Sequence, residues 1–205
     1  MNSIHSSPHF GLIIVSAPSG AGKSSLCSEL LKRNSSRIAL SISSTSRKPR
    51  GAETNGKEYY FLSEEEFQNK IKLNNFAEWA IVHGNYYGTS RETLEYFWKQ
   101  KKHVLLDIDV QGAENLRKTF PDRSFSVFIV PPDLEVLEQR LRGRGTEAED
   151  AIQKRMANAR NEMNHLDKFD FSVVNDEFNT TYDQLERAVL SFMDQLEGGK
   201  WQKLP

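Results

Sequence analysis

The stretch GLIIVSAPSGAGKSS, residues 11–25, decides the fold of this chain. Gly11 to Ser16 is a short apolar run rich in branched residues, which predicts a buried strand. A cluster of small residues and proline then interrupts the run. The amphipathic stretch from Ser24 to Lys32 predicts a helix directly afterwards. The predicted order is strand, loop and helix.

The loop between that strand and helix fits the phosphate-binding pattern G-x-x-x-x-G-K-[ST] at every position except the first, where Ala17 replaces glycine. Small residues let consecutive backbone N–H groups surround phosphate oxygens, and the helix that follows adds the positive end of its dipole. The lysine supplies a point charge, and the hydroxyl of Ser24 is expected to hold Mg²⁺. An alanine at the first position is acceptable if its backbone stays outside the left-handed region. The predicted triphosphate site consists of Ala17, Pro18, Ser19, Gly20, Ala21, Gly22, Lys23 and Ser24.

Three further apolar runs predict strands of the same sheet, at residues 103–108, 125–130 and 171–174. The first two are continuous rather than alternating, as expected for strands that are covered on both faces. Helical patterns follow the runs, including the periodic segment 182–196. Strands that alternate with helices predict an α/β fold, in which helices flank a parallel sheet of the P-loop NTPase type.

Two segments interrupt this alternation. Residues 43–90 mix short β-type runs with a turn and with a helix that the capping box at 63–66 begins, so we expect an inserted subdomain there. Residues 140–155 are basic and rich in glycine, with a second capping box at 146–149, and predict a short helical lid. We assign the rest of the chain to a core P-loop domain, residues 11–42, 91–139 and 156–196, and to flexible tails at 1–10 and 197–205.

The bulk composition narrows the possible functions. The 27 Lys+Arg residues nearly balance the 28 Asp+Glu residues, so nothing in the net charge of -1 favours nucleic acid or a membrane as a partner. Cys27 is the only cysteine, which excludes an intrachain disulfide and fits a reducing compartment. The sequence contains neither a signal peptide nor an apolar run of about 18 residues. We therefore expect a cytoplasmic protein, and the sequence leaves open whether it forms a homo-oligomer.

The phosphate loop is shared by GTPases, ATPases and kinases of small molecules, so the acceptor must be inferred from other segments. A GTPase would carry an Asn-Lys-x-Asp motif, and the nearest string, NKIK at 69–72, lacks the aspartate. Arg47 and Arg50 flank Pro49, and two guanidinium groups suit a phosphate monoester. Solvated surface arginines are the alternative interpretation.

Four more strings follow in order: EWA at 78–80, GNYYGT at 84–89, LDIDVQG at 106–112 and RLRGRG at 140–145. After an SGAGKSS loop, this order resembles the guanylate kinase family over residues 12–196. The resemblance implies that ATP with Mg²⁺ is the phosphoryl donor, that GMP and also dGMP are acceptors, and that ADP and GDP are the products. It also implies that the inserted subdomain binds GMP.

The resemblance assigns site residues by position. Those expected to hold the GMP phosphate are Arg47, Arg50, Tyr59 and Tyr87. Those expected around the base are Ser43, Glu78, Thr89 and Asp109. Glu53 and Asp107 complete the acceptor set. Gly51 stands one place earlier than the glycine of the family pattern, which affects the turn that positions Glu53. Asp107 either orients Mg²⁺ through water or orders the acceptor site. The catalytic cations expected to neutralise the transferring group are Lys23, Arg47, Arg140, Arg144 and Arg155, and Asn175 is assigned to the ATP site.

The chemistry of guanine agrees with this assignment. Guanine presents its N1–H and 2-amino group side by side, and one ionised carboxylate can accept from both. Glu78 is the natural acceptor, whereas a structural salt bridge is the alternative role for a carboxylate in that apolar stretch. Adenine has an acceptor at N1 and no 2-amino group, so we expect a strong preference for GMP over AMP.

Phosphoryl transfer to GMP needs positioning and charge neutralisation rather than a catalytic base, because the acceptor phosphate is already ionised near neutral pH. A lid that closes over both nucleotides would exclude water and prevent hydrolysis of ATP. Two rival functions are a guanylate-kinase-like module that has lost catalysis and holds a partner protein, and a kinase of another nucleotide. The intact Gly20, Gly22, Lys23 and Ser24 argue against the first rival.

Overall fold

The computed structural model describes residues 10–82, 84–143 and 149–202. Its central sheet contains the strands β1 (Leu12–Ser16), β2 (Ile38–Leu40), β7 (His103–Asp107), β8 (Ser124–Val130) and β9 (Phe171–Val174). They lie in the order β2-β7-β1-β8-β9, and every neighbouring pair is parallel. The four strands predicted from sequence are confirmed, whereas the three-residue β2 at the edge was not predicted.

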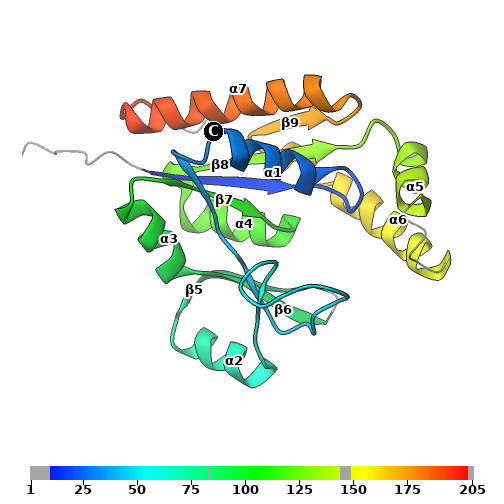
Figure 1. Ribbon diagram of the computed structural model, residues 1–205, viewed down its shortest axis with the longest axis horizontal. Coiled ribbons are helices and arrows are strands. Elements are labelled where there is room, and N and C mark those ends of the chain that lie inside the picture. Colours follow the sequence, from blue (N-terminus) through cyan, green and yellow to red (C-terminus); the bar gives the residue numbers. More distant parts are fainter. Residues whose placement is uncertain (1–9, 83, 144–148, 203–205) are drawn as a thin grey trace, which may run out of the picture.

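Helices cover both faces of this sheet (Figure 1). On one face lie α1 (Lys23–Arg33) and α7 (Phe178–Glu197), and on the other lie α3 (Arg91–Lys99) and α4 (Val110–Thr119). Successive strand residues point to opposite faces, so within β1 Ile13 packs in the cluster of α1 and α7 while Ile14 packs in that of α3 and α4. This double cover explains the continuous apolar runs. In the described part of the chain, no helix is long and apolar enough to cross a membrane.

The predicted insertion forms a second, four-stranded sheet, which we call the inserted sheet. Its strands are β3 (Ser44–Thr45), β4 (Tyr60–Phe61), β5 (Phe76–Val82) and β6 (Asn85–Ser90), in the order β4-β3-β6-β5. Helix α2 (Glu64–Lys72) begins with the predicted capping box, because the Glu66 N–H donates to Ser63 Oγ at 3.1 Å and the Ser63 N–H donates to Glu66 Oε2 at 2.7 Å. Figure 1 shows this sheet beyond the layer of α3 and α4. Ala77 of β5 packs with Leu94 of α3, which joins the two sheets into one body.

Helices α5 (Leu134–Arg142) and α6 (Glu149–Met163) lie together at one end of the central sheet (Figure 1). Leu137 and Leu141 of α5 pack with Ile152 and Met156 of α6 in a small core of their own. The second predicted capping box falls mainly on residues 144–148, which lie outside the described residues. Two 3₁₀ turns, η1 (Pro121–Arg123) and η2 (Leu166–Lys168), complete the described elements.

The inner ends of both predicted tails make packing contacts in the structure, and the flexibility of the tails stays a prediction. The carbonyl of Phe10 accepts a hydrogen bond from Arg123 Nε at 3.0 Å. At the other terminus, the ring of Trp201 lies edge-on to Phe192 and Phe125, with centroids 4.8 and 5.8 Å apart. Polar flanking residues suggested fraying, but a single large aromatic side chain is enough to anchor such a segment.

Candidate active site

A cavity of about 680 Å³ lies between the phosphate loop, residues 17–24, and the inserted sheet. We call it the main cavity. The loop follows β1, and Asp107 and Asp109 follow the buried part of β7, so both meet at the carboxyl edge of the parallel sheet. The predicted donor residues that line the cavity are Ala17, Pro18, Ser19, Gly20, Gly22, Lys23 and Ser24. The predicted acceptor residues that line it are Ser43, Glu53, Tyr59, Glu78, Tyr87, Asp107 and Asp109.

Two glycines give the phosphate loop its shape. Gly20 and Gly22 have φ angles of 97° and 91°, in the left-handed region that favours glycine. Among the described residues, the only non-glycines with positive φ are Asn74 and Lys101, so Ala17 has an ordinary backbone conformation. The one departure of the loop from the phosphate-binding pattern therefore introduces no backbone strain.

Lys23 and Ser24 both turn toward Asp107. Lys23 Nζ forms an ion pair with Asp107 and donates to the carbonyl of Ile108 at 3.2 Å, while Ser24 Oγ donates to Asp107 Oδ2 at 3.3 Å. Burial is the largest single effect and lowers the pKa of Lys23, but the charge and the hydrogen bond of Asp107, with smaller contributions from Cys27 and Tyr59, together outweigh it, so the net shift is upward. The lysine is thus fully charged, and its partner is a carboxylate at the end of β7.

Asn175 and Arg140 lie behind the phosphate loop rather than in the main cavity. Asn175 Nδ2 donates to the carbonyl of Ala21 at 2.7 Å, and Arg140 Nη2 donates to the carbonyl of Asn175 at 3.1 Å. Asn175 therefore supports the loop from behind through its hydrogen bond to Ala21. It also packs directly on Gly22, because a Cβ atom there would lie 2.2 Å from the Asn175 amide nitrogen. Contact of Asn175 or Arg140 with ATP stays a prediction.

Of the other two predicted lid arginines, the structure describes Arg155 but not Arg144. Arg155 Nη1 donates to Ser19 Oγ at 2.8 Å, which places the side chain at the rim of the phosphate loop. Arg144 lies outside the described residues. Arg142, by contrast, is an exposed residue that pairs with Glu138 and Glu149.

Glu78 is a buried carboxyl group on β5, only 7% exposed. Its Oε1 accepts a hydrogen bond from Thr89 Oγ1 at 2.7 Å, and no lysine or arginine pairs with it among the described residues. Burial is the main reason that the pKa of Glu78 rises to about 7; the Thr89 hydrogen bond opposes the shift, and the charge of Asp109 adds to it. The structural salt bridge considered from sequence is therefore not formed within the described part of the chain.

A glycine leaves room for the Glu78 carboxylate at the start of α4. A side chain on Gly112 would lie 3.2 Å from Glu78 Oε2. Asp109 caps the same helix, because its Oδ1 accepts from the backbone N–H of Gln111 at 2.8 Å and of Gly112 at 3.2 Å. Thr89 is completely buried and touches the site only through Glu78.

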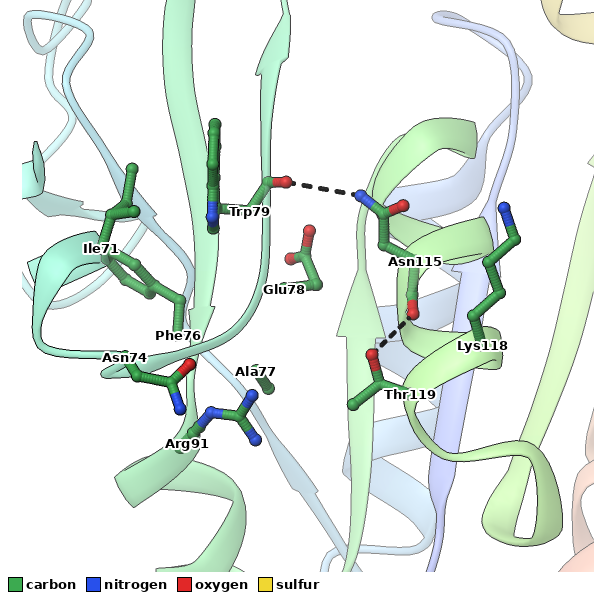
Figure 2. Close-up of a pocket in the computed structure, with 10 residues that line it drawn as sticks. All are labelled: Ile71, Asn74, Phe76, Ala77, Glu78, Trp79, Arg91, Asn115, Lys118 and Thr119. Carbon is green, nitrogen blue, oxygen red and sulfur yellow. Dashed lines mark hydrogen bonds between the residues drawn. The ribbon is translucent and has the colours of Figure 1, made fainter.

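Glu78 also borders a second, smaller cavity of about 340 Å³ between the inserted sheet and the core helices (Figure 2). Here Asn115 Nδ2 of α4 donates to the carbonyl of Trp79 at 3.4 Å. Arg91 and Lys118 line the same space. The carboxylate is therefore held where the inserted sheet meets the core.

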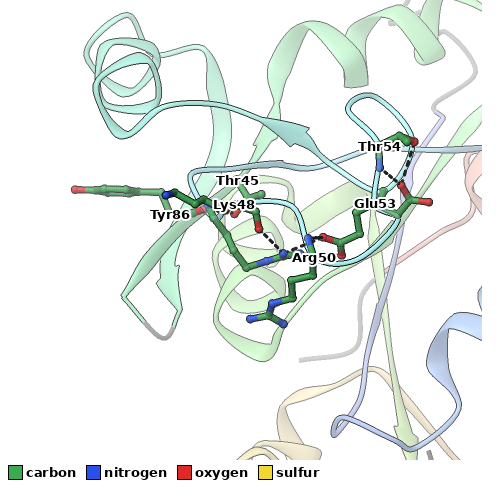
Figure 3. Close-up of polar contacts among 8 residues, drawn as sticks. Thr45, Lys48, Arg50, Glu53, Thr54 and Tyr86 are labelled. Atoms are coloured by element: carbon green, nitrogen blue, oxygen red, sulfur yellow. Dashed lines mark hydrogen bonds and ion pairs between the residues drawn. The ribbon is translucent and has the colours of Figure 1, made fainter. Parts of the chain in front are cut away.

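Arg47 is held by Glu53 in a two-point ion pair. Arg47 Nη1 and Nη2 donate to the two oxygens of Glu53 at 2.9 and 3.0 Å, and this hydrogen bonding raises the pKa of Arg47. Glu53 also accepts from the backbone N–H of Arg50 at 2.7 Å (Figure 3). Gly51 turns the chain with a φ of 53°, so the shifted glycine is compatible with the Glu53 contact. Neither arginine borders the main cavity, and Arg50 is exposed.

Tyr59 and Tyr87 border the main cavity beside this ion pair. Their rings lie edge-on with centroids 5.9 Å apart, and the Arg47 guanidinium lies 5.3 Å from the centre of the Tyr59 ring. Burial raises the pKa of Tyr59. Tyr86 stacks on Phe67 of α2 at 5.2 Å, so its ring packs within the inserted subdomain.

The sequence reasoning missed several residues of the main cavity, among them Ser41, Glu58 and Glu162. Glu162 of α6 lines the cavity together with Lys23 and Asp109. It follows Arg155 by two helical turns, and residues at that spacing share a helix face. That spacing was the available signal, but no motif marked it.

These features define the class of the protein. A phosphate loop that opens into a cavity, with a buried carboxylate and two tyrosines from an inserted subdomain lining the same cavity, is the arrangement of a P-loop phosphotransferase. Comparison with known proteins narrows the class. The family model described as guanylate kinase matches residues 10–191.

Individual proteins agree with the family match. A guanylate kinase of Idiomarina loihiensis is 50% identical over 187 residues, which cover 90% of this chain and 89% of the relative. A guanylate kinase of Hydrogenovibrio crunogenus is 50% identical over 180 residues, covering 88% and 87%. The crystal structure of guanylate kinase from Anaplasma phagocytophilum matches with a TM-score of 0.73 and 30% identity, over 90% of this chain and 87% of that chain. The chain belongs to the guanylate kinase family, and the resemblance and fold class predicted from sequence are confirmed.

Proposed function

We propose that the chain transfers the γ-phosphoryl group of ATP to GMP, forming ADP and GDP, and that dGMP is a second acceptor. The observation that carries the acceptor assignment is Glu78: a buried carboxyl group, paired only with a hydroxyl within the described residues, that faces the cavity of the phosphate loop. Guanine offers two adjacent donors to such a group, and their hydrogen bonds would favour its ionised form.

On the donor side, the backbone of the phosphate loop and the charge of Lys23 would hold the β and γ phosphates. Lys23 would exchange Asp107 for phosphate oxygens, since a cation that already lies at the loop needs only a change of partner. Ser24 and Asp107 present oxygen ligands within 3.3 Å of each other, which fits the preference of Mg²⁺. Ser24 would bind the ion directly and Asp107 through water. When bound, Mg²⁺ would neutralise charge on the β and γ phosphates.

On the acceptor side, we assign the GMP phosphate to Tyr59, Tyr87 and Arg47. The ion pair of Arg47 with Glu53 fixes the guanidinium beside the two rings, and the exposed Arg50 has the freedom to fold toward a bound phosphate. Ser43, Asp109 and Thr89 would surround the base, with Thr89 acting through Glu78. The chain needs no catalytic base, because the attacking phosphate oxygen is already ionised.

We further propose that residues 43–90 and 140–155 approach each other when both nucleotides bind. The support for this motion is that Arg155 already touches Ser19, while α5 and α6 pack mainly on each other. Closure would bring lid cations to the transferring group and exclude water. Small-angle scattering with and without a bisubstrate analogue tests it, and an unchanged radius of gyration would contradict closure.

We place the reaction in the cytoplasm, where both nucleotides occur and where the buried thiol of Cys27 stays reduced. The activity is tested by coupling ADP release to a spectrophotometric readout with GMP, dGMP, AMP or UMP as acceptor. We expect turnover with GMP and dGMP, and loss of turnover in Lys23→Ala. Lys32→Ala, an exposed lysine of the same helix, is the matched control. Equal rates with AMP and GMP, or no GMP-dependent rate, would refute the assignment.

A further inference from the structure

Glu162 is a carboxyl group in the main cavity that has no partner in the described part of the chain. It is half-buried on α6, its backbone carbonyl closes a turn with the His165 N–H, and no described side chain donates to its oxygens. Burial raises its pKa to about 7, the charge of Lys23 opposes the shift, and that of Asp109 adds to it. A group in this state gains free energy when a ligand brings it a hydrogen-bond donor.

The neighbours of Glu162 show which part of a ligand would meet it. Lys23 marks the end of the cavity where the phosphates meet, and Asp109 lies beside Glu78 at the end that takes the base. Glu162 lines the same cavity as Lys23 and Asp109, and the charges of both act on its carboxyl group, so this group lies near both the phosphate end and the base end. In a nucleoside monophosphate, the ribose lies between phosphate and base.

Among the groups of GMP, the ribose hydroxyls are the suitable hydrogen-bond donors to Glu162. Phosphate oxygens are acceptors and would be repelled by an ionised carboxylate, and the donors on the edge of guanine are matched by Glu78. The ribose hydroxyls are the remaining donors of GMP, and acidic side chains bind ribose hydroxyls in this way in dinucleotide-binding folds. We propose that Glu162 is a substrate-binding residue that accepts a hydrogen bond from a ribose hydroxyl of the acceptor nucleotide. This inference rests on the proposed function, because it assumes that GMP occupies the cavity.

The test compares three ligands that differ by one hydroxyl: GMP, 2′-deoxy-GMP and 3′-deoxy-GMP. Calorimetry without ATP measures the dissociation constant of each for the wild-type chain, Glu162→Ala, and Asn161→Ala, an exposed neighbour on the same helix as the matched control. We expect Glu162→Ala to weaken GMP binding roughly tenfold or more, since a hydrogen bond to a charged group is lost. For the deoxynucleotide that lacks the contacted hydroxyl, the substitution should change binding less than about twofold. Glu162→Gln, which keeps an acceptor oxygen, should give an intermediate loss.

Kinetics then separate binding from chemistry. A ribose contact is the same in the ground state and the transition state, so KM for GMP should rise in Glu162→Ala while kcat stays nearly unchanged. An equal loss of affinity for all three nucleotides, or a fall in kcat at unchanged KM, would overturn the proposal. Failure of the proposed function would give a different result, because the wild-type chain would not turn over GMP at all. The calorimetric comparison would still show whether Glu162 contributes to binding of a ribose hydroxyl.

Discussion

Replacing Glu78 with glutamine is expected to stabilise the free protein above pH 7 and, at the same time, to remove most of its activity toward GMP. Glu78 is 7% exposed, and burial raises its pKa from an ordinary value of 4.5 to about 7. The raised value means that the folded protein favours the neutral carboxyl group. The stability that this group contributes is fully present below pH 4.5 and is lost as the pH rises through about 7.

The size of the effect follows from the two pKa values. Each tenfold difference in proton affinity corresponds to about 1.4 kcal/mol, so ionisation of buried Glu78 costs the folded state about 3 kcal/mol at pH 8. Glutamine is neutral at every pH, and its carbonyl oxygen can still accept the hydrogen bond from Thr89. The variant should therefore equal the wild type near pH 4.5 and exceed its free energy of unfolding by about 3 kcal/mol at pH 8.

Urea unfolding between pH 4.5 and 8 measures this difference for the wild type, Glu78→Gln and Glu65→Gln, an exposed glutamate of α2 that serves as the control. Comparing variants at each pH isolates Glu78 from the other titrating groups, including Glu162. A stability difference that does not grow with pH, or a variant that is less stable throughout, would refute the reasoning.

The same variant tests the base assignment. A glutamine cannot accept from both guanine donors, since its amide nitrogen would face one of them, so kcat/KM for GMP should fall by roughly two to four orders of magnitude. Because the variant is expected to be more stable, unfolding could not explain the loss. Unchanged kcat/KM for GMP would mean that Glu78 does not bind the base.

Three further substitutions test particular contacts. Glu53→Gln removes the two-point pairing of Arg47, and we expect KM for GMP to rise about tenfold with a smaller change in kcat, measured in the coupled assay. Gly22→Ala forces a methyl group toward Asn175 at a φ of 91°, so the free energy of unfolding should fall by about 1–3 kcal/mol and KM for ATP should rise; an unchanged variant would mean that the loop is more adaptable than its geometry indicates. Trp201→Ala removes a ring that is packed on Phe192 and Phe125 and should cost about 2 kcal/mol in urea unfolding without affecting KM for either nucleotide.

The sequence predicted those parts of the fold that depend on local patterns. The run at residues 12–15 is apolar at every position because helices cover both of its faces. The capping box at 63–66 consists of the two side chains that form its hydrogen bonds, so it can be recognised in the sequence. The loop at 17–24 could be located because its glycines and its lysine follow a strand at fixed spacing. By contrast, β2 has only three residues, which is too short for a periodic signal.

The unpredicted parts of the site depend on contacts between distant residues. Asn175 is far from Ala21 in the sequence, and only the folded chain shows that its amide supports the loop. Glu162 reaches the main cavity because α6 returns to the phosphate loop, where Arg155 meets Ser19. A lone asparagine after a strand carries no pattern of its own. The spacing of Glu162 from Arg155 became informative only once the fold placed Arg155 at the loop.

In the free protein, the cations assigned to the phosphates are paired with carboxylates, whereas the carboxyl group assigned to the base is not paired with a cation in the part of the chain that the structure describes. This difference suits a substrate that has anionic phosphates and a base with hydrogen-bond donors. Each of two cations assigned to phosphates has a carboxylate partner in the free protein: Lys23 pairs with Asp107, and Arg47 pairs with Glu53. These partners keep the cations charged and in place, and a phosphate can take over or share them without exposing an unpaired buried charge. Glu78 has only a hydroxyl partner within the described residues, so its ionised form is costly until a ligand supplies donors. A ligand that brings two adjacent donors would thus gain free energy from this buried carboxyl group, which pairs with no lysine or arginine among the described residues, whereas a ligand with an acceptor there would gain none. Selectivity for guanine over adenine would then arise from the pKa of Glu78 as much as from the shape of the cavity.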